Sequence, residues 1–407
     1  MKKISVLGAT GSIGKSALDI ISRNKDKFEV ALLSAFSNRH ELEKLKQQWP
    51  SAVCLLAGEE NGTEKLLAAI TETKADITIN GISGAAGLEP SIAAIQSGSN
   101  LALANKETIV MAGELVFRLA KKNNVKIIPV DSEHSAIFHL IEAHIRRSEE
   151  SDNNKTTEFH RGEENIRNQT PNSSVPSVVK NSSFLSEIIL TASGGPFRKL
   201  SLKEMERVTP EDALAHPTWK MGPKITIDSA SMANKGLEII EACLFFNMPP
   251  EKIQVVIHPQ SIVHSMIKLC NGVIYAQLSK PDMRHPIHDA LFWPDTFPLN
   301  IDPLNFDSLT LEFEKPDLEK FPMLTLAWEA ARLGKLYPCA YNAANEEAVA
   351  AFLKKQIGFF DIPRITASVL ESDWSGGHAY DCSNLQTILE ADANALSKAK
   401  SCIKGRF

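Results

Sequence analysis

The sequence predicts an α/β protein with a Rossmann-like parallel sheet at its N-terminus, a central α+β domain and a helical C-terminal domain. Three observations lead to this prediction. The first 130 residues alternate between short apolar runs, typical of buried strands, and stretches with helical periodicity. A glycine-rich turn directly follows the first apolar run. After a stretch rich in Pro and Asp, the rest of the chain has helical periodicity.

The N-terminal strands are expected at Ile4–Leu7, Val30–Ser34, Val53–Leu56, Ile77–Ile79, Leu101–Ala104 and Val125–Val130. Between them, helices are expected at Ser12–Arg23, His40–Gln48, Glu64–Thr71, Glu89–Ser97 and Glu107–Lys121. Strands that alternate with helices imply right-handed crossovers and a parallel, doubly wound sheet. Ligands of such sheets bind at the carboxyl ends of the strands, so the residues that follow each strand are candidates for function.

We predict a dinucleotide-binding domain at residues 1–131, a catalytic and connective domain at 132–292, a linker at 293–319 and a helical domain at 320–407. Within the second domain, residues 148–183 contain only five hydrophobic side chains against 13 Ser or Asn. Such a segment buries too little apolar surface to offset the entropy of ordering it. It is therefore expected to be a mobile surface insertion.

Later elements follow from the same signals. Strands are expected at Ile188–Leu190, Ile225–Ile227, Ile253–Ile257 and Val273–Leu278, with a helix from Asn234 to Phe246. Near the C-terminus, apolar residues recur at helical spacing from Leu385 to Ala399, although Asp392 interrupts this face.

Charge and composition exclude several classes of protein. The chain has 407 residues, and 44 Lys and Arg against 49 Asp and Glu leave a net charge of −5. This balance indicates neither a nucleic-acid partner nor an anionic membrane. No apolar run approaches the length of a membrane-spanning helix. The strand expected at Ile4 leaves no room for a signal or transit peptide, and six scattered cysteines are typical of reduced thiols, so we expect a cytoplasmic protein.

The first strand runs into Gly8-Ala9-Thr10-Gly11-Ser12-Ile13-Gly14 and then a helix. Glycines there permit a tight turn and a close approach of the backbone to a pyrophosphate, and the helix N-terminus attracts the phosphates. The alternative is a turn that serves only helix–strand packing. The stretch Ser34–Arg39 contains no acid to bind a ribose 2′-hydroxyl, and Arg39 is nearby, which favours NADP over NAD. Arg39 could instead be a solvated residue at a helix start.

Two carboxylates follow the last N-terminal strand, at Asp131 and Glu133. In an extended chain they would point to the same side, where their repulsion calls for a cation or a proton between them. A second cluster, Asp228–Glu238, reads as a strand end followed by a helix, and Glu238 could complete a carboxylate triad. Oxygen ligands suit Mg²⁺ or Mn²⁺ better than zinc. The alternatives are a solvated strand end and an ordinary capped helix.

Phosphate-binding residue types accompany these acids. Ser229, Asn234 and Lys235 lie at the expected helix start, and Ser193-Gly194-Gly195 forms another candidate anion cradle. Between them, the segment His216–Pro223 is flanked by Pro and Gly yet carries His, Trp219 and Met. We expect a mobile lid over a ligand, the alternative being a loop packed permanently on the core.

Together these motifs resemble the 1-deoxy-D-xylulose 5-phosphate reductoisomerase family. The matching runs are Gly8–Gly14, Ala104–Glu107, Asp131–Ala136, Ser193–Phe197, His216–Gly222, Asp228–Glu238, Ile257–Met266, Pro281–Arg284 and Asn342–Glu346. The resemblance spans nearly the whole chain except residues 148–183. The family differs after the second strand, where it often has Gly-Lys-Asn instead of Phe36-Ser37-Asn38.

The resemblance implies a role for each matching residue. The NADPH-binding residues would be Thr10, Gly11, Ser12, Ile13, Asn38, Asn105, Glu107 and Gly222, with Phe36, Ser37 and Arg39 as further candidates. The ligands of Mn²⁺ or Mg²⁺ would be Asp131, Glu133 and Glu238. The sugar-phosphate substrate would contact Lys106, Ser132, Glu133, Ser193, His216, Trp219, Ser229, Asn234, Lys235 and Glu238. Of these, Lys106 and His216 join the three metal ligands as catalytic candidates. His264 lies near the family's site, although a core histidine is an equal reading.

The family converts 1-deoxy-D-xylulose 5-phosphate to 2-C-methyl-D-erythritol 4-phosphate, an isoprenoid precursor, by rearranging the carbon skeleton and reducing the resulting aldehyde with NADPH. The resemblance also suggests a homodimer. One alternative is a semialdehyde or homoserine dehydrogenase, but none of the six cysteines lies in the nucleophile context that a semialdehyde dehydrogenase needs. Another is a dinucleotide-sensing regulator, which would need no carboxylate triad.

Overall fold

The computed structural model describes residues 1–159, 184–219, 221–375 and 384–405. Its first six strands form one parallel sheet in the order β3-β2-β1-β4-β5-β6. The strands are β1 (Lys2–Leu7), β2 (Phe28–Ala35), β3 (Val53–Leu56), β4 (Ile77–Asn80), β5 (Asn100–Leu103) and β6 (Ile127–Pro129). The predicted Rossmann-like sheet is thus confirmed, and its strand order reverses between β1 and β4, where such folds bind dinucleotides.

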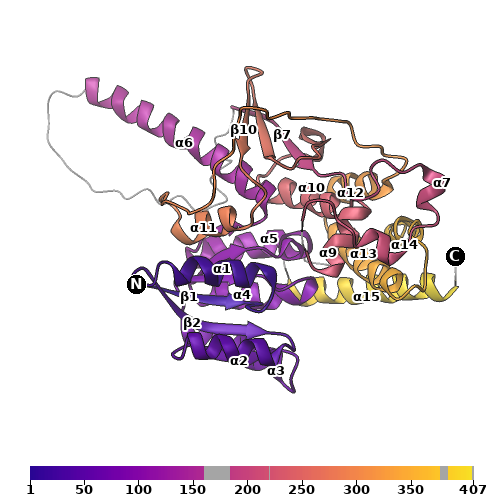
Figure 1. Cartoon of the computed structure of the whole chain (residues 1–407), viewed down its shortest axis with the longest axis horizontal. Helices are drawn as coiled ribbons and strands as arrows, with labels where there is room; N and C mark the ends of the chain where they lie inside the picture. The colour runs from indigo at the N-terminus through magenta and orange to yellow at the C-terminus, as the bar shows by residue number, and fades with distance from the viewer. Residues whose placement is uncertain (160–183, 220, 376–383, 406–407) are drawn as a thin grey trace.

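Helices cover both faces of this sheet (Figure 1). They are α1 (Ser12–Ser22), α2 (Arg39–Gln48), α3 (Gly62–Thr73), α4 (Leu88–Gln96) and α5 (Lys106–Asn123), with the short turn η1 (Ala85–Gly87) before α4. Right-handed crossovers place α1 and α2 on one face and α3, α4 and α5, which pack on one another in series, on the other. The N-termini of α1 and α5 therefore lie at the same sheet edge.

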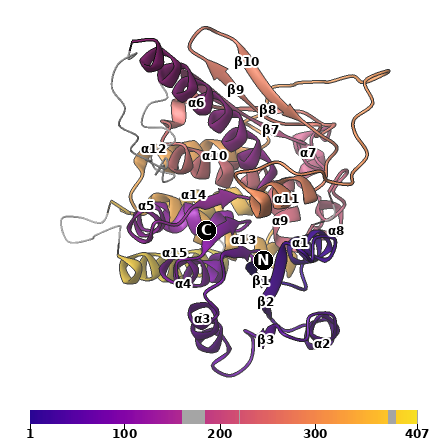
Figure 2. The ribbon, with the colours of Figure 1, turned by 90° about the vertical axis from the view of Figure 1, so that its left-hand side faces the viewer.

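A second, mixed sheet has the order β10-β9-β7-β8 (Figure 2). Its strands are β7 (Leu185–Ala192), β8 (Ile253–Ile257), β9 (Val263–Leu269) and β10 (Ile274–Leu278). The sequence reading missed β9, which pairs antiparallel with both β7 and β10. Helix α6 (Ser132–Phe159) packs on β9 and β10. Because it extends to Phe159, residues 148–159 of the expected insertion are helical. The remainder, 160–183, lies outside the described residues.

The predicted strand Ile225–Ile227 is wrong, because these residues belong to helix α9 (Pro223–Ala230). Gly222 is the residue before the helix and Pro223 opens it, a position where proline's fixed φ favours helix. These start signals outweigh the β-branched run that suggested a strand. Helix α10 (Ala233–Phe245) follows directly, after Met232 in a left-handed conformation with φ of 62°.

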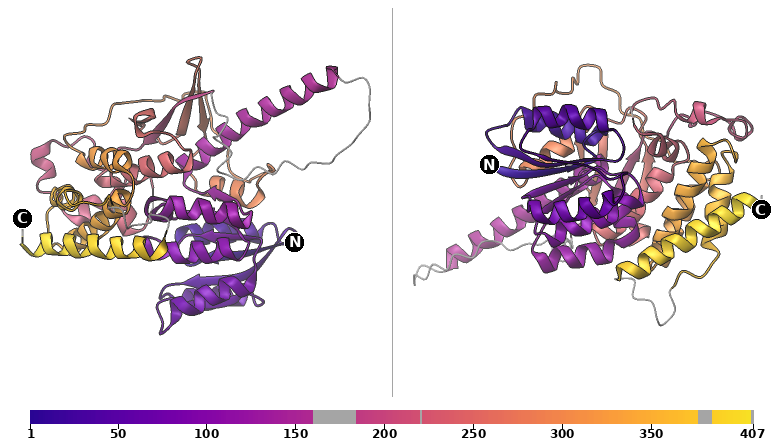
Figure 3. Two further views of the ribbon diagram at one scale, coloured as in Figure 1. Left: turned by 180° about the vertical axis from the view of Figure 1, so that it is seen from behind. Right: turned by 90° about the horizontal axis from the view of Figure 1, so that it is seen from below.

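The helical C-terminal region is confirmed. It contains α12 (Pro322–Leu333), α13 (Tyr337–Leu353), α14 (Asp361–Leu370) and α15 (Leu385–Gly405). Helix α13 is buried along most of its length, between α12, α14 and α15 of its own region and α5 of the N-terminal domain. Figure 3 shows these helices, orange to yellow, packed beside the N-terminal sheet. The C-terminal helices are therefore in direct contact with the domain expected to bind the dinucleotide.

The remaining short elements are α7 (Leu202–Met205), α8 (Pro210–Ala213), η3 (Pro250–Lys252) and α11 (Arg284–Phe292), the last of which packs on α1. Between α11 and α12 the chain is mostly irregular and touches the second sheet where Glu314 pairs with Ile257. No helix within the described residues is long and apolar enough to cross a membrane.

Candidate active site

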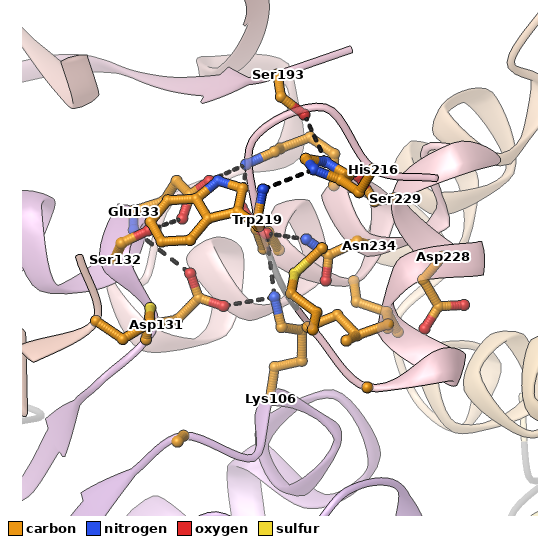
Figure 4. A pocket seen from close by; sticks show the side chains of 18 of the residues that line it. Lys106, Asp131, Ser132, Glu133, Ser193, His216, Trp219, Asp228, Ser229 and Asn234 are labelled. Atoms are coloured by element: carbon orange, nitrogen blue, oxygen red, sulfur yellow. Dashed lines mark hydrogen bonds and ion pairs between the residues drawn. The ribbon is translucent and has the colours of Figure 1, made fainter. Parts of the chain in front are cut away.

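A cavity of about 460 Å³ lies where the two sheets and the α9–α10 helices meet. Its walls include Gly11–Ile13 after β1, Gly81–Ser83 after β4, Lys106 and Glu107 at the start of α5, and Asp131–Glu133 after β6. The opposite wall comes from β7, from His216, Trp219, Met221 and Gly222, and from α9 and α10. Figure 4 shows the side chains of Lys106, Asp131 and Glu133 facing those of His216 and Asn234 across this space.

The glycine-rich turn has the geometry of a phosphate cradle. Gly8 has a φ of 78°, and a Cβ added there would lie 2.8 Å from the carbonyl oxygen of Gly81. A Cβ on Gly14 would lie 2.5 Å from the Gly8 carbonyl oxygen, so α1 approaches the end of β1 this closely only because residue 14 is glycine. Helix α1 begins at Ser12 with no side-chain cap, which leaves its first backbone N–H groups available to an anion.

The other coenzyme candidates lie in two groups. The first group follows β2. Asn38 caps α2 there by accepting from the backbone N–H of Glu41, and Arg39 forms an ion pair with Glu59. Phe36 is 75% exposed, and Ser37 is also exposed. Thr10, in the glycine-rich turn, is half-buried. These residues lie outside the walls of the cavity itself.

The second group lies at the start of α5 and of α9. Glu107 and Gly222 line the cavity. Asn105 is buried and holds backbone together: its Nδ2 donates to the carbonyl oxygens of Ile82 and Gly84, and its Oδ1 caps α5. Asn105 therefore shapes the loop after β4, which itself lines the cavity.

The three predicted metal ligands come together around two buried lysines. Lys106 Nζ lies 2.5 Å from Asp131 Oδ2 and 3.0 Å from Glu238 Oε1. Lys235 Nζ lies 2.7 Å from Glu133 Oε1 and also pairs with Glu238. Because both lysines and Glu238 are almost fully buried, this is a low-dielectric cluster in which each charge depends on its partners.

The expected extended geometry of Asp131 and Glu133 is wrong, since α6 begins at Ser132 and places Glu133 in its first turn. The two carboxylates consequently face different lysines. Burial and the nearby Glu238 charge raise the pKa of Glu133 to about 7. Burial opposes ionisation of Asp131 as well, but the Lys106 ammonium holds the pKa of that carboxyl well below its usual value. The cluster thus has more acid than its lysines neutralise, which favours an added cation.

On the opposite side of the cavity, His216 orients two hydroxyl groups (Figure 4). Its Nδ1 accepts from the backbone N–H groups of Thr218 and Trp219, at 3.1 and 2.9 Å. Its Nε2 lies 3.1 Å from both Ser193 Oγ and Ser229 Oγ. Burial lowers the pKa of His216, so a neutral ring with its proton on Nε2 fits these contacts. His216 then donates toward the two serines.

Trp219 lines the cavity and is half-buried. Asn234, on the first turn of α10, donates from Nδ2 to Glu238 Oε1 at 2.6 Å. Ser132 donates to the Glu133 carboxylate at 2.6 Å. His264, on β9, also lines the cavity, where its Nε2 lies 2.7 Å from Ser279 Oγ. Every predicted substrate-binding residue thus lines the same cavity.

Comparison with known proteins identifies the family. Models of 1-deoxy-D-xylulose 5-phosphate reductoisomerase match residues 4–61 and 58–113, and models of its C-terminal domains match residues 170–246 and 278–398. The reductoisomerase of Treponema denticola is 47% identical, with 92% of this chain and 91% of that protein covered. That of Pelodictyon phaeoclathratiforme is 44% identical over 99% of this chain and 100% of the relative.

The chain belongs to the 1-deoxy-D-xylulose 5-phosphate reductoisomerase family. Solved structures of such reductoisomerases agree. A complex with NADPH, fosmidomycin and magnesium is 35% identical, with a TM-score of 0.86 and coverage of 99% of this chain and 98% of the other. The Zymomonas mobilis enzyme in complex with NADPH is 37% identical, with a TM-score of 0.80 and coverage of 99% of both chains.

For a reductoisomerase, the donor set suits a divalent cation. Asp131, His134 and Glu238 each offer an atom within 4.8 Å of the others, whereas Glu133 lies beside them on Lys235. Sequence reasoning missed His134, which is fully buried with its Nδ1 4.0 Å from Asp131 Oδ1 and 3.5 Å from Glu241 Oε2. Its place directly after Glu133 was the available signal. Burial disfavours the protonated form of His134, but the Glu241 carboxylate outweighs this effect and raises the pKa of His134.

Proposed function

We propose that this chain catalyses the NADPH-dependent and divalent-metal-dependent conversion of 1-deoxy-D-xylulose 5-phosphate to 2-C-methyl-D-erythritol 4-phosphate in isoprenoid precursor biosynthesis. One observation carries the proposal. A dinucleotide cradle after β1, a carboxylate cluster after β6 and on α10, and a group of phosphate-binding side chains line the same cavity. The three parts serve reduction, metal-assisted rearrangement and recognition of a sugar phosphate, in that order. They must lie close enough together to contact one substrate molecule.

The coenzyme-binding residues in this proposal surround the β1 and β4 ends. They are Thr10, Gly11, Ser12, Ile13, Phe36, Ser37, Asn38, Arg39, Asn105, Glu107 and Gly222. The free N–H groups at the start of α1 would face the pyrophosphate. Asn105 would act by fixing the loop after β4.

We assign Asp131, Glu133 and Glu238 to Mn²⁺ or Mg²⁺, and Ser193, Ser229, Asn234 and Lys235 to the substrate phosphate. When bound, the metal ion supplies a Lewis acid for the substrate's carbonyl and hydroxyl oxygens, and NADPH supplies a hydride. The chain's own residues position these partners. Lys106 and Lys235, now held by the carboxylates, would be released to anionic groups of substrate as the cation takes over their ion pairs.

His216 and Trp219 would act together at the cavity mouth. His216 donates from Nε2, which leaves the hydroxyl protons of Ser193 and Ser229 free to face phosphate oxygens. The same ring holds the backbone of Thr218 and Trp219 through Nδ1, so phosphate contact and lid position are mechanically linked. The Trp219 indole would then exclude water from the reacting carbons.

We further propose a cytoplasmic homodimer with the domain boundaries predicted above. Strand β10 is an edge of the second sheet, and its Ile274 and Tyr275 are 50% and 38% exposed, a surface that pairing with a second copy would cover. The five cysteines within the described residues are free thiols, as in a reducing compartment.

The test is the identity of the product. The chain would be incubated with NADPH, Mn²⁺ and 1-deoxy-D-xylulose 5-phosphate labelled with ¹³C, and the products followed by NMR. The proposal expects a branched 2-C-methyl-D-erythritol 4-phosphate that forms in step with loss of NADPH absorbance. Reduction of the substrate without rearrangement of its carbon skeleton would refute it.

A further inference from the structure

A cluster of ionised and amide side chains joins three parts of the chain on the coenzyme side of the cavity. Lys224, in the first turn of α9, has its Nζ 2.8 Å from Glu107 Oε1 on α5 and 3.0 Å from Asp228 Oδ2 on α9. The same Nζ lies 3.9 Å from Glu346 Oε1 on α13. Asn345, also on α13, donates to Asp228 Oδ1 at 2.7 Å. Helix α13 of the C-terminal region therefore reaches the wall of the cavity.

Glu346 also holds the loop after β4. Its Oε1 accepts the backbone N–H of Ala85 at 3.1 Å. Gly84 has a φ of 74°, and a Cβ there would lie 2.8 Å from the same oxygen. The loop approaches the carboxylate this closely only because residue 84 is glycine. Since Gly81–Ser83 line the cavity, a C-terminal side chain fixes part of its nucleotide wall.

The charges of the cluster depend on one another. Three carboxylates, those of Glu107, Asp228 and Glu346, surround the Lys224 ammonium at 2.8, 3.0 and 3.9 Å. Burial raises the pKa of Glu346 to about 7, while Lys224 opposes this rise and Glu107 and Asp392 add to it. Lys224 thus keeps Glu107 and Glu346 in place against their mutual repulsion.

We propose that Glu346 and Lys224 are positioning residues for the coenzyme, so that the C-terminal helices complete the dinucleotide site. Glu346 fixes the position of the loop after β4. Lys224 holds the carboxylate of Glu107 and, through Asp228, the start of α9 next to Gly222. The inference rests on the proposed function, because there Glu107 and Gly222 contact NADPH. The sequence places Glu346 in a matching run, Asn342–Glu346, but assigns no role to it or to Lys224.

The experiment measures NADPH binding directly on the full-length protein, by fluorescence titration without substrate. Glu346→Ala removes the acceptor for Ala85, and Lys224→Met removes the ammonium. Lys224→Arg is the conservative rescue. The matched control is Glu347→Ala, the neighbouring acid on α13, whose carboxylate lies 3.8 Å from Lys400 and outside the cluster. Circular dichroism reports whether each variant is folded, and steady-state kinetics give KM for each substrate.

We expect both disruptive variants to raise the Kd for NADPH about tenfold or more, as loss of a charge-assisted contact does. Lys224→Arg should recover most of this loss, Glu347→Ala should stay within about twofold of the wild type, and KM for the sugar phosphate should change far less than KM for NADPH. Should Glu346→Ala fail to fold, Lys224→Met must still raise the Kd for NADPH, whereas Glu346→Gln, which keeps an acceptor for the backbone N–H of Ala85, should retain most of the binding.

Unchanged Kd values in folded variants would overturn the inference, as would an equal rise in KM for both substrates, which indicates a general structural defect. Wild-type protein that binds no NADPH would instead refute the proposed function. The two failures are therefore distinguishable.

Discussion

The Lys106→Met variant tests how the carboxylate cluster is stabilised. The Lys106 ammonium lies between Asp131 and Glu238, at 2.5 and 3.0 Å, and its side chain is only 5% exposed. Methionine has a similar length and no charge. The substitution therefore leaves the buried Glu238 carboxylate and the partly buried Asp131 carboxylate converging on an apolar group.

The magnitude follows from burial. Removing one partner of a buried ion pair typically costs about 3–5 kcal/mol, because the remaining charges stay in a low-dielectric site without compensation. The control is Lys268→Met. Lys268 pairs with Glu187 at 3.0 Å, but these side chains are 35% and 23% exposed. A pair of this kind contributes about 0–1 kcal/mol.

Mn²⁺ should largely reverse the loss. A divalent cation between Asp131 and Glu238 replaces the missing positive charge, and at a hundredfold excess over its Kd a ligand stabilises the folded state by about 2.7 kcal/mol. In the wild type the cation must first displace Lys106, so the variant should gain more from Mn²⁺ than the wild type does. The assay is urea unfolding followed by circular dichroism, with EDTA and with Mn²⁺. A loss no larger than that of Lys268→Met, or one that Mn²⁺ does not reduce, would refute this reasoning.

Three further predictions concern the lid, the coenzyme and pH. Trp219→Ala should lower the free energy of unfolding without ligand by less than about 1 kcal/mol, against about 3–5 kcal/mol for a core tryptophan, while raising KM or lowering kcat. Denaturant unfolding measures the first effect and steady-state kinetics the second. A large loss of stability with normal kinetics would contradict the lid assignment. Arg39→Ala should weaken NADPH about ten- to a hundredfold and NADH less, by titration of each coenzyme; equal losses would show that Arg39 does not read the 2′-phosphate. The pKa of Glu346 is raised to about 7 from 4.5, so its contribution to stability is greatest at low pH and is lost as pH rises through 7. Unfolding between pH 5 and 8 should show that Glu346→Gln removes a decline on the order of 3 kcal/mol, and parallel wild-type and variant curves would reject the shift.

The N-terminal sheet could be predicted because its signals are local. Each strand is a short apolar run, each helix has its own periodicity, and the glycine turn marks the first crossover. Ile225–Ile227 failed for the opposite reason. Three residues of strand-like composition are too short to decide between strand and helix, and the Gly222-Pro223 start and the packing of α9 on α10 and α13 determine the result.

The candidate site could be predicted in much of its membership, although not His134, but not in its geometry. Asp131, Glu133 and Glu238 do gather, yet α6 starts at Ser132 and turns Glu133 toward Lys235. The contacts of Lys224 with Glu107 and Glu346 join residues more than a hundred positions apart, for which a single sequence carries no local signal. Such contacts depend on how the helices pack, and only the structure reveals them.

The most direct test of a metal-dependent reductoisomerase is the rate of NADPH oxidation against free Mn²⁺, with 1-deoxy-D-xylulose 5-phosphate as substrate and metal-free protein at the start. The account predicts no turnover in EDTA, a saturable rise as Mn²⁺ is added, and severe loss of that response in Glu238→Gln while NADPH binding is kept. NADPH oxidation at an undiminished rate in EDTA, or a normal Mn²⁺ response in Glu238→Gln, would contradict it.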